Sequence, residues 1–129
     1  MARRRNRTLT ELELEIMRIV WAVEEATVGD LSEALEDAGR PLALPSIRTM
    51  LGILQKKGYV KRRRVGRGYI YRAAVPAGQA KKRILRDLID RAFDGSASDL
   101  VAALVSEGMV GPDDLARARQ LIRDKEGRV

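Results

Sequence analysis

The chain has 129 residues and a formal net charge of +7, from 25 Lys and Arg and 18 Asp and Glu. This length holds one domain, or one small domain with an appended module. His and Cys are both missing from the sequence, which excludes imidazole and thiolate metal sites, disulfides and Ser-His or Cys-His nucleophile pairs; we expect no enzyme activity and no cofactor. No apolar run could span a bilayer, and residues 1–5 lack the apolar core of a secretory signal, so we expect a cytoplasmic protein without membrane insertion.

The first part of the chain predicts two helices with the same start signal. Thr10 and Glu13 have the spacing of a capping box, in which each side chain accepts a hydrogen bond from the backbone of the other. Apolar residues then recur at helical spacing and predict a helix from about Glu11 to Val23, with Leu12, Ile16, Ile19, Val20 and Val23 on one face. Thr27 and Asp30 repeat the signal, which predicts a second helix from about Val28 to Asp37.

A third helix is expected from about Pro45 to Lys57. Proline suits the first helical position, and it disfavours the α conformation for the preceding residue, Leu44. Gly58 can end this helix. The core face is formed by Ile47, Met50, Leu51 and Leu54. Two β-rich runs, 59–65 and 69–73, then flank a Gly-containing turn, which predicts a basic hairpin.

After Pro76 the apolar spacing is helical again and predicts three short helices, separated at Gly95 and Gly108. The first of them has an apolar arc wider than the usual stripe of about 100°. Short helices of this total length bury too little surface to be stable alone, so we expect a two-fold dimer; the alternative is that they pack back on the first part of the chain. The expected dimer contacts are Ile84, Leu85, Leu88, Ile89, Phe93, Leu100, Leu104 and Leu121.

Acidic and basic residues are segregated along the sequence. The segment from Glu11 to Asp37 has nine acids and one base, whereas residues 38–86 have no acid and fourteen of the 25 Lys and Arg. A positive surface of one sign suits a polyanion, because each Lys or Arg that neutralises a phosphate releases a counterion. We therefore expect a nucleic-acid partner; the alternative is a solvated basic face that binds nothing.

Three helices followed by a basic hairpin is the order of a winged helix-turn-helix, in which the last helix before the hairpin enters the major groove. Arg, Ser and Thr can bind bases or phosphates, and Gly52 would let the backbone approach closely. Lys57, Lys61 and Arg63 are expected to add phosphate attraction, as is a basic arm of Arg3, Arg4, Arg5 and Arg7 if it is ordered. The predicted DNA-binding residues are Ser46, Arg48, Thr49, Gly52, Lys56, Arg62, Arg64 and Arg67.

The predicted fold is mainly α with a small β-hairpin. Residues 1–75 would form a winged helix-turn-helix DNA-binding domain, and residues 76–129 a three-helix dimerisation module. The function that fits best is a homodimeric transcriptional repressor of double-stranded DNA. Two other classes stay open: a winged helix used as a protein-interaction or RNA-binding module, and a regulator that responds to a small ligand. One side of the hairpin, with Tyr69 and Tyr71, could be core packing or surface.

Four segments resemble the BlaI/MecI family of penicillinase and methicillin-resistance repressors: 14–21, 46–51, 54–60 and 68–71. The resemblance extends from about Leu9 to Ile122 and is most specific around the first and third helices. It implies a bacterial repressor with a C-terminal dimerisation module and a palindromic operator. It also implies induction by proteolysis in that module, triggered by a membrane sensor for β-lactams. The recognition-helix positions that it carries over are Ser46, Arg48 and Thr49.

The sequence departs from this family in two respects. Relatives are cut between Asn and Phe in the second C-terminal helix, where this chain has Ala103 and Leu104. Related copper-responsive repressors have a C-terminal Cys cluster, and this chain has no Cys. Copper or zinc sensing by that route is therefore excluded.

Overall fold

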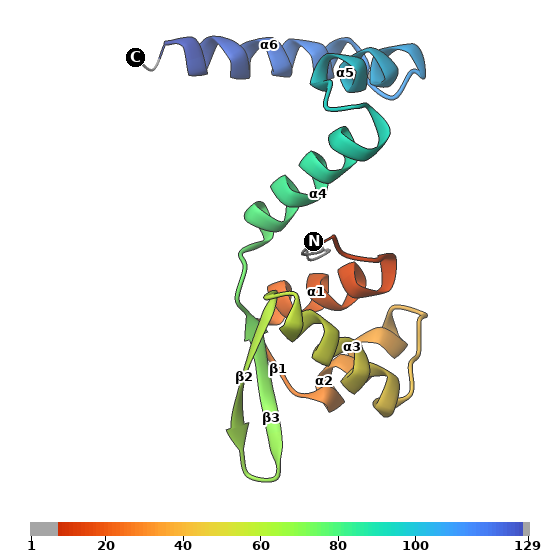
Figure 1. Ribbon diagram of the computed structural model, residues 1–129, viewed down its shortest axis with the longest axis vertical. Helices are drawn as coiled ribbons and strands as arrows, with labels where there is room; N and C mark the ends of the chain where they lie inside the picture. Colours follow the sequence, from red (N-terminus) through yellow and green to blue (C-terminus); the bar gives the residue numbers. More distant parts are fainter. Residues whose placement is uncertain (1–7, 128–129) are drawn as a thin grey trace, which may run out of the picture. The chain divides into compact units, whose positions relative to one another are not determined.

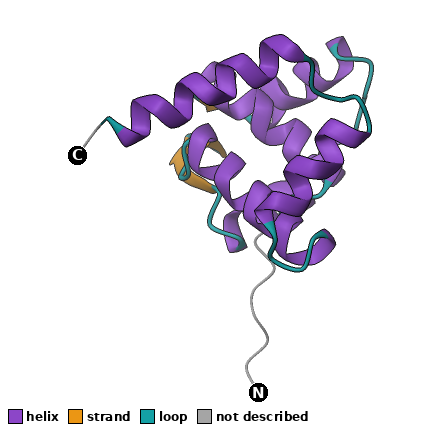
Figure 2. Ribbon diagram, turned by 90° about the horizontal axis from the view of Figure 1, so that it is seen from above, coloured by secondary structure: helices purple, strands orange, loops and turns teal. Residues whose placement is uncertain are grey.

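The computed structural model describes residues 8–127, and Figure 1 shows their helices and strands. Within this range the helices are α1 (Glu11–Val23), α2 (Val28–Asp37), α3 (Leu44–Lys56), α4 (Ala77–Ala92), α5 (Ala97–Ser106) and α6 (Pro112–Glu126). The strands are β1 (Glu25–Ala26), β2 (Val60–Val65) and β3 (Gly68–Ala73). The predicted class, mainly α with a small hairpin, is confirmed (Figure 2).

The chain divides into two compact units, Met1–Leu85 and Arg86–Val129. The first unit has the element order of a winged helix-turn-helix, with α3 directly before the β2–β3 hairpin, which we call the wing. The sequence predicts the helical module from residue 76, but the first turns of α4 also serve the first unit: Ala80 is fully buried and Ile84 packs against its core.

Both predicted capping boxes are present. Thr10 Oγ1 accepts from the Glu13 backbone at 3.2 Å, and Glu13 Oε1 accepts from the Thr10 backbone at 2.8 Å. The apolar face predicted for α1 is not buried at its end, because Val23 is 50% exposed. The helix stops there: Glu24, with φ of 70°, turns the chain into β1. The face that is buried consists of Glu13, Ile16, Met17 and Val20.

Helix α3 supplies the centre of the core. Ile47, Leu51 and Leu54 are fully buried, whereas Met50 is half-buried and packs against the cluster from the side. The helix begins at Leu44, so the prediction that Pro45 keeps Leu44 out of the helix is wrong. Pro45 is then the second helical residue, where its missing N–H is still one that no helical carbonyl would have accepted.

The sheet is antiparallel with the strand order β1-β3-β2. Val65 lies opposite Gly68, so Gly66 and Arg67 form the tip of the wing. Gly66 has φ of 61°, a conformation that favours glycine. Cross-strand pairing puts Arg62 opposite Tyr71 and Arg64 opposite Tyr69, and because side chains alternate, these four share one face of the wing.

Strand β1 was not predicted, because two residues, Glu25 and Ala26, give no alternating pattern. Its place is set by pairing: Ala26, almost fully buried, lies opposite Tyr71 of β3. Trp21 of α1 holds the segment that follows β3, since its Nε1–H donates to the Val75 carbonyl at 2.8 Å.

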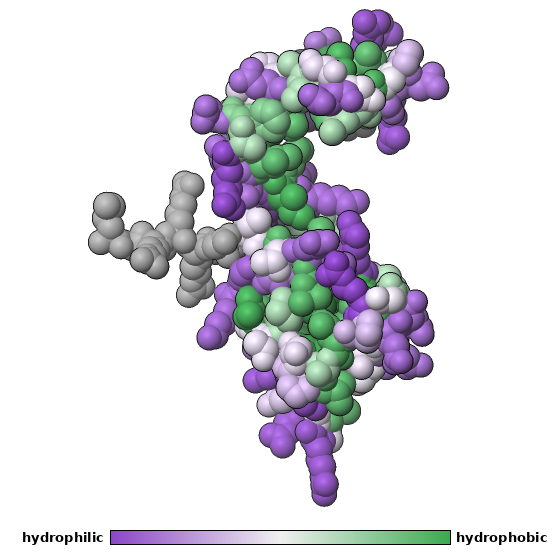
Figure 3. Space-filling model, turned by 90° about the vertical axis from the view of Figure 1, so that its right-hand side faces the viewer, coloured by the Kyte–Doolittle hydropathy of each residue, from purple (hydrophilic) through white to green (hydrophobic). Residues whose placement is uncertain are grey.

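The helices of the second unit have their own start signals. Ser96 Oγ accepts from the Asp99 backbone at 3.1 Å at the start of α5. At the start of α6, the Asp114 carboxylate accepts from the Gly111 backbone at 2.9 Å. Apolar side chains nevertheless stay on the surface of these helices (Figure 3). The large exposed ones are Leu88, Val101, Val105, Leu115, Leu121 and Ile122, and Met109 in the loop between α5 and α6 is exposed as well.

Candidate DNA-binding surface

The outward face of α3 carries the side chains that the sequence predicted for it. With Ile47, Leu51 and Leu54 in the core, the opposite side of the helix is exposed over its whole length. The Thr49 hydroxyl donates to the Pro45 carbonyl at 3.0 Å, so its oxygen remains available only as an acceptor. The exposed predicted residues of α3 are Ser46, Arg48, Thr49, Gly52 and Lys56.

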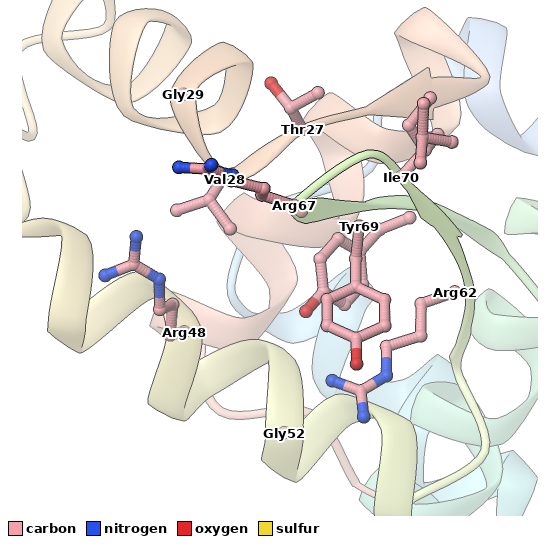
Figure 4. Close-up of a pocket in the computed structure, with 12 residues that line it drawn as sticks. Thr27, Val28, Gly29, Arg48, Gly52, Arg62, Arg67, Tyr69 and Ile70 are labelled. Atoms are coloured by element: carbon pink, nitrogen blue, oxygen red, sulfur yellow. The ribbon is translucent and has the colours of Figure 1, made fainter.

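A groove of about 500 Å³ lies between α3, the wing and the start of α2 (Figure 4). We call it the α3–wing groove. Four predicted DNA-binding residues line it together: Arg48 and Gly52 from α3, and Arg62 and Arg67 from the wing. In the part of the chain that the structure describes, no acidic residue contributes to this lining. The groove is therefore a concentrated positive site, which suits an anion.

Arg62 stacks on an aromatic ring inside the groove. Its guanidinium carbon lies 3.9 Å from the centroid of the Tyr69 ring, the geometry of a cation–π contact. Tyr69 is half-buried and Tyr71 almost fully buried, so only Tyr71 belongs to the core. Sequence reasoning left Tyr69 undecided. The signal for it was the strand alternation, which puts Tyr69 on the same face as Arg62.

Other residues lie beside or line the α3–wing groove. Arg64 is exposed beside the turn, and its Nε–H donates to the Gly66 carbonyl at 3.4 Å. Thr27, which precedes α2, and Val28 and Gly29 in its first turn also line the groove. Sequence analysis missed them, because nothing local marks a helix start as part of a binding surface.

Lys57 is not part of the DNA-facing charge, which corrects the sequence prediction. Its ammonium donates to Glu13 Oε1 at 2.8 Å and to the Thr8 carbonyl at 2.9 Å. The Glu13 side chain is 1% exposed and that of Lys57 17%. Burial raises the pKa of Glu13, but the hydrogen bonds from Lys57 and Thr10 outweigh it and lower that pKa below its ordinary value. This pair joins the start of α1 to the end of α3.

The charge segregation along the sequence is only partly kept in space. Arg40 pairs with Glu11 at 3.3 Å and with Glu15 at 3.2 Å. Arg63, on the other face of the wing from Arg62, pairs with Glu25 at 3.2 Å. Within residues 8–127, no carboxylate pairs with the three groove arginines, Arg48, Arg62 and Arg67. The positive surface is thus narrower than the basic window predicted.

The residues predicted for dimerisation are on the C-terminal helices but differ in exposure. Leu85, Leu88 and Leu121 are 49%, 44% and 57% exposed. Ile84 instead packs against the core of the first unit. The remaining four are half-buried: Ile89, Phe93, Leu100 and Leu104.

Some predictions fall outside this geometry. The basic arm of Arg3, Arg4, Arg5 and Arg7 lies outside the described residues. Among residues 8–127, no helix is both long enough and apolar enough to cross a membrane. No group of three or more metal-ligating side chains occurs in that range.

A winged helix-turn-helix whose exposed third helix borders an arginine-lined groove defines a DNA-binding protein of the transcription-regulator class. The chain belongs to the penicillinase repressor family, whose model matches residues 9–124. It is a DNA-binding transcriptional repressor, and the members of this family are repressors rather than enzymes. The predicted family resemblance, and the prediction of no enzyme activity, are confirmed.

Individual relatives agree with this assignment. The chain is 23% identical over 117 residues to the methicillin resistance regulatory protein MecI of Mammaliicoccus sciuri, covering 91% of this chain and 94% of the relative. It is 30% identical over 117 residues to an uncharacterised 16.5 kDa protein of Latilactobacillus sakei, covering 91% and 80%. The solved DNA-binding domain of the repressor BlaI matches with a TM-score of 0.51 and 22% identity, over 60% of this chain and 93% of that one.

Proposed function

We propose that this repressor acts in the cytoplasm as a homodimer on a palindromic operator. Residues of the winged unit would bind DNA, and α4 to α6 would hold two copies together. The exposed face of α3 would enter the major groove, while the wing would follow the backbone. The α3–wing groove carries this proposal, because three arginines line it beside Gly52 and none of them has an acidic partner among residues 8–127. Ser46, Arg48 and Thr49 are the residues that would read bases.

The exposed apolar side chains of α4 to α6 support a second copy of the chain as the partner. Leu88, Val101 and Leu121 are each more than two-fifths exposed, and large apolar side chains that gather on a surface mark an interaction site. A two-fold dimer would cover the same patch on both copies. It would also place two winged units on half-sites one helical turn, or a multiple of it, apart.

Proteolysis in the C-terminal helices, signalled by a membrane sensor, would then release the repressor. Two half-sites that are bound by one linked dimer give far higher affinity than either alone. A cut in α5, where Ala103 and Leu104 lie, would separate the two winged units without touching the DNA-binding surface. The MecI and penicillinase repressor names of its relatives support an antibiotic-resistance context.

Salt dependence of binding to duplex DNA tests the DNA-binding part of the proposal. If each subunit neutralises about four phosphates, the dimer should show a log–log slope of affinity against salt of about −7. A fluorescence titration at several salt concentrations measures this slope. A slope near zero on the best duplex found would contradict the proposal.

Alanine variants separate base reading from backbone contact. Arg48→Ala should lower discrimination between operator and random DNA by about 1–3 kcal/mol, because it removes a base contact. Thr49→Ala should act in the same direction. Arg67→Ala should weaken both kinds of DNA alike. Equal losses on both DNAs for all three variants would contradict base reading by α3.

A further inference from the structure

The fold of the described residues does not explain why Arg62 stacks on Tyr69. Arg62 is exposed on β2, and among the described residues it has no carboxylate partner. An arginine with a solvated side chain samples many rotamers, which costs free energy when a ligand fixes one of them. A ring 3.9 Å below the guanidinium restricts that freedom before any ligand arrives.

Gly52 of α3 puts no side chain into the groove that contains this stack. A Cβ added to Gly52 would meet nothing within 4 Å, so the fold does not require glycine at this position. Glycine inside a helix costs about 1 kcal/mol relative to alanine. A stability cost without a packing reason points to something outside the chain that approaches α3 here. Arg62, Tyr69 and Gly52 all line the same groove (Figure 4).

Arg62 and its neighbour on β2, Arg63, differ in the residues that they contact. Arg63 follows Arg62 directly, lies on the opposite face of the wing and is held by Glu25 at 3.2 Å. The two arginines thus differ in their partners: an acid neutralises Arg63, whereas an uncharged ring orients Arg62. Of these two neighbours, Arg62 is the one that no carboxylate of the described residues pairs with, so it can bind an external anion without first breaking an ion pair.

We propose that Tyr69 is a positioning residue of the DNA-binding surface, which holds the Arg62 guanidinium over Gly52 so that it binds one phosphodiester of the duplex backbone. This inference rests on the proposed DNA-binding function. A planar guanidinium can give two parallel hydrogen bonds to a phosphate, and stacking leaves its edge available for them. The Tyr69 hydroxyl is not needed for this role, since the ring alone orients the arginine.

A double-mutant cycle on the full chain tests it, with a fluorescent duplex of mixed sequence as the probe. Arg62→Ala should weaken binding about tenfold and lower the salt slope by about one for each subunit. Tyr69→Leu should weaken binding as well. The double variant should be no weaker than Arg62→Ala alone, because Tyr69 acts only through Arg62. Tyr69→Phe should bind like the parent.

Arg63→Ala is the matched control on the same strand. Its effect should combine additively with Tyr69→Leu, since Arg63 is on the other face of the wing. Additive losses for Tyr69→Leu and Arg62→Ala, or a full loss in Tyr69→Phe, would overturn the inference. If Tyr69→Leu proves unfolded by circular dichroism, Arg62→Lys replaces it: a lysine that restores parental affinity would overturn the inference, and a loss of severalfold would support it.

The two proposals can fail separately. A parent chain that shows no salt-dependent binding to any duplex overturns both the DNA-binding proposal and this inference. A parent that binds with a steep slope while the cycle is additive overturns only the role of Tyr69.

Discussion

The two units of this chain differ in how far they bury their apolar side chains. Within residues 8–127, every nearly fully buried apolar side chain lies between Leu9 and Ala80, and the core around Ile47, Leu51 and Leu54 is closed. From Lys81 to Gly127 no side chain reaches that degree of burial, although large apolar residues recur on all three helices. The first unit has a closed core, whereas the second unit leaves large apolar side chains exposed.

This difference separates two kinds of function. A closed core supports a rigid surface, on which α3 and the wing can hold charged side chains at fixed positions. An open apolar face is an interaction surface. The candidate DNA-binding groove thus lies on the unit with the closed core, and the proposed self-association lies on the unit without one.

The largest effect should come from placing a charge in the open unit. Leu88→Asp should lower affinity for a two-half-site duplex by about 100-fold or more, because it would bury an unpaired carboxylate in the dimer interface and undo the linkage of two winged units. Operator titration and sedimentation of the same sample measure it. Gln79→Asp adds the same charge to the exposed face of α4 and should leave the dimer intact; a dimeric Leu88→Asp would contradict the account.

The same truncation should act differently in the two units. Leu51→Ala should lower the free energy of unfolding by about 2–5 kcal/mol, since it opens a cavity in a closed core. Leu121→Ala should change the unfolding of the winged unit by less than about 0.5 kcal/mol, while it weakens self-association. Urea unfolding at several protein concentrations separates the two effects. Similar losses in both variants, independent of concentration, would contradict a closed core in one unit and an open apolar face in the other.

The buried ion pair between Lys57 and Glu13 adds a polar contribution to the closed unit. Lys57→Met should cost about 3 kcal/mol, because the Glu13 carboxylate would remain buried with one partner fewer. The pKa of Glu13 is lowered in the fold, so its stabilisation is present above the unfolded pKa of about 4.3 and is lost as pH falls through the folded pKa. Urea midpoints measured from neutral pH to acid should fall less steeply in Glu13→Gln. Equal slopes for this variant and the parent would contradict it.

The smallest effect should be a gain in stability. Gly52→Ala should stabilise the winged unit by up to about 1 kcal/mol, because alanine favours the helix and its Cβ has open space. DNA affinity should fall, since that methyl group projects into the α3–wing groove. Gly58→Ala is the control: φ of 83° at Gly58 should make this variant less stable. Thermal melts and duplex titrations test both; unchanged affinity in Gly52→Ala would contradict a close approach there.

The elements were largely predictable because their signals are local. Thr10 with Glu13 marked the start of α1, and Gly58 marked the end of α3, as the structure has them. The exposed positions on α3 followed from the helical period once Ile47 and Leu51 were assigned to the core. The groove on which they converge needed the hairpin to be placed next to α3, which no local pattern contains.

Contacts between residues far apart in the sequence could not be predicted from local patterns. Lys57 has the same local surroundings as Lys56, but only Lys57 meets Glu13, which lies far away along the chain. Arg63 and Arg62 are neighbours, and their different roles depend on Glu25 and Tyr69 on other strands. A run of basic residues predicted a positive surface, and the tertiary structure decides which of them are neutralised.

Sedimentation equilibrium of the parent chain at micromolar concentration tests the proposed dimer, because the proposed operator binding depends on how the open unit is covered. We expect a species of twice the 14.4 kDa chain mass, and dissociation to single chains in Leu88→Asp with the winged unit still folded. A parent that sediments at the mass of one chain, with its apolar helices exposed to solvent, would contradict it.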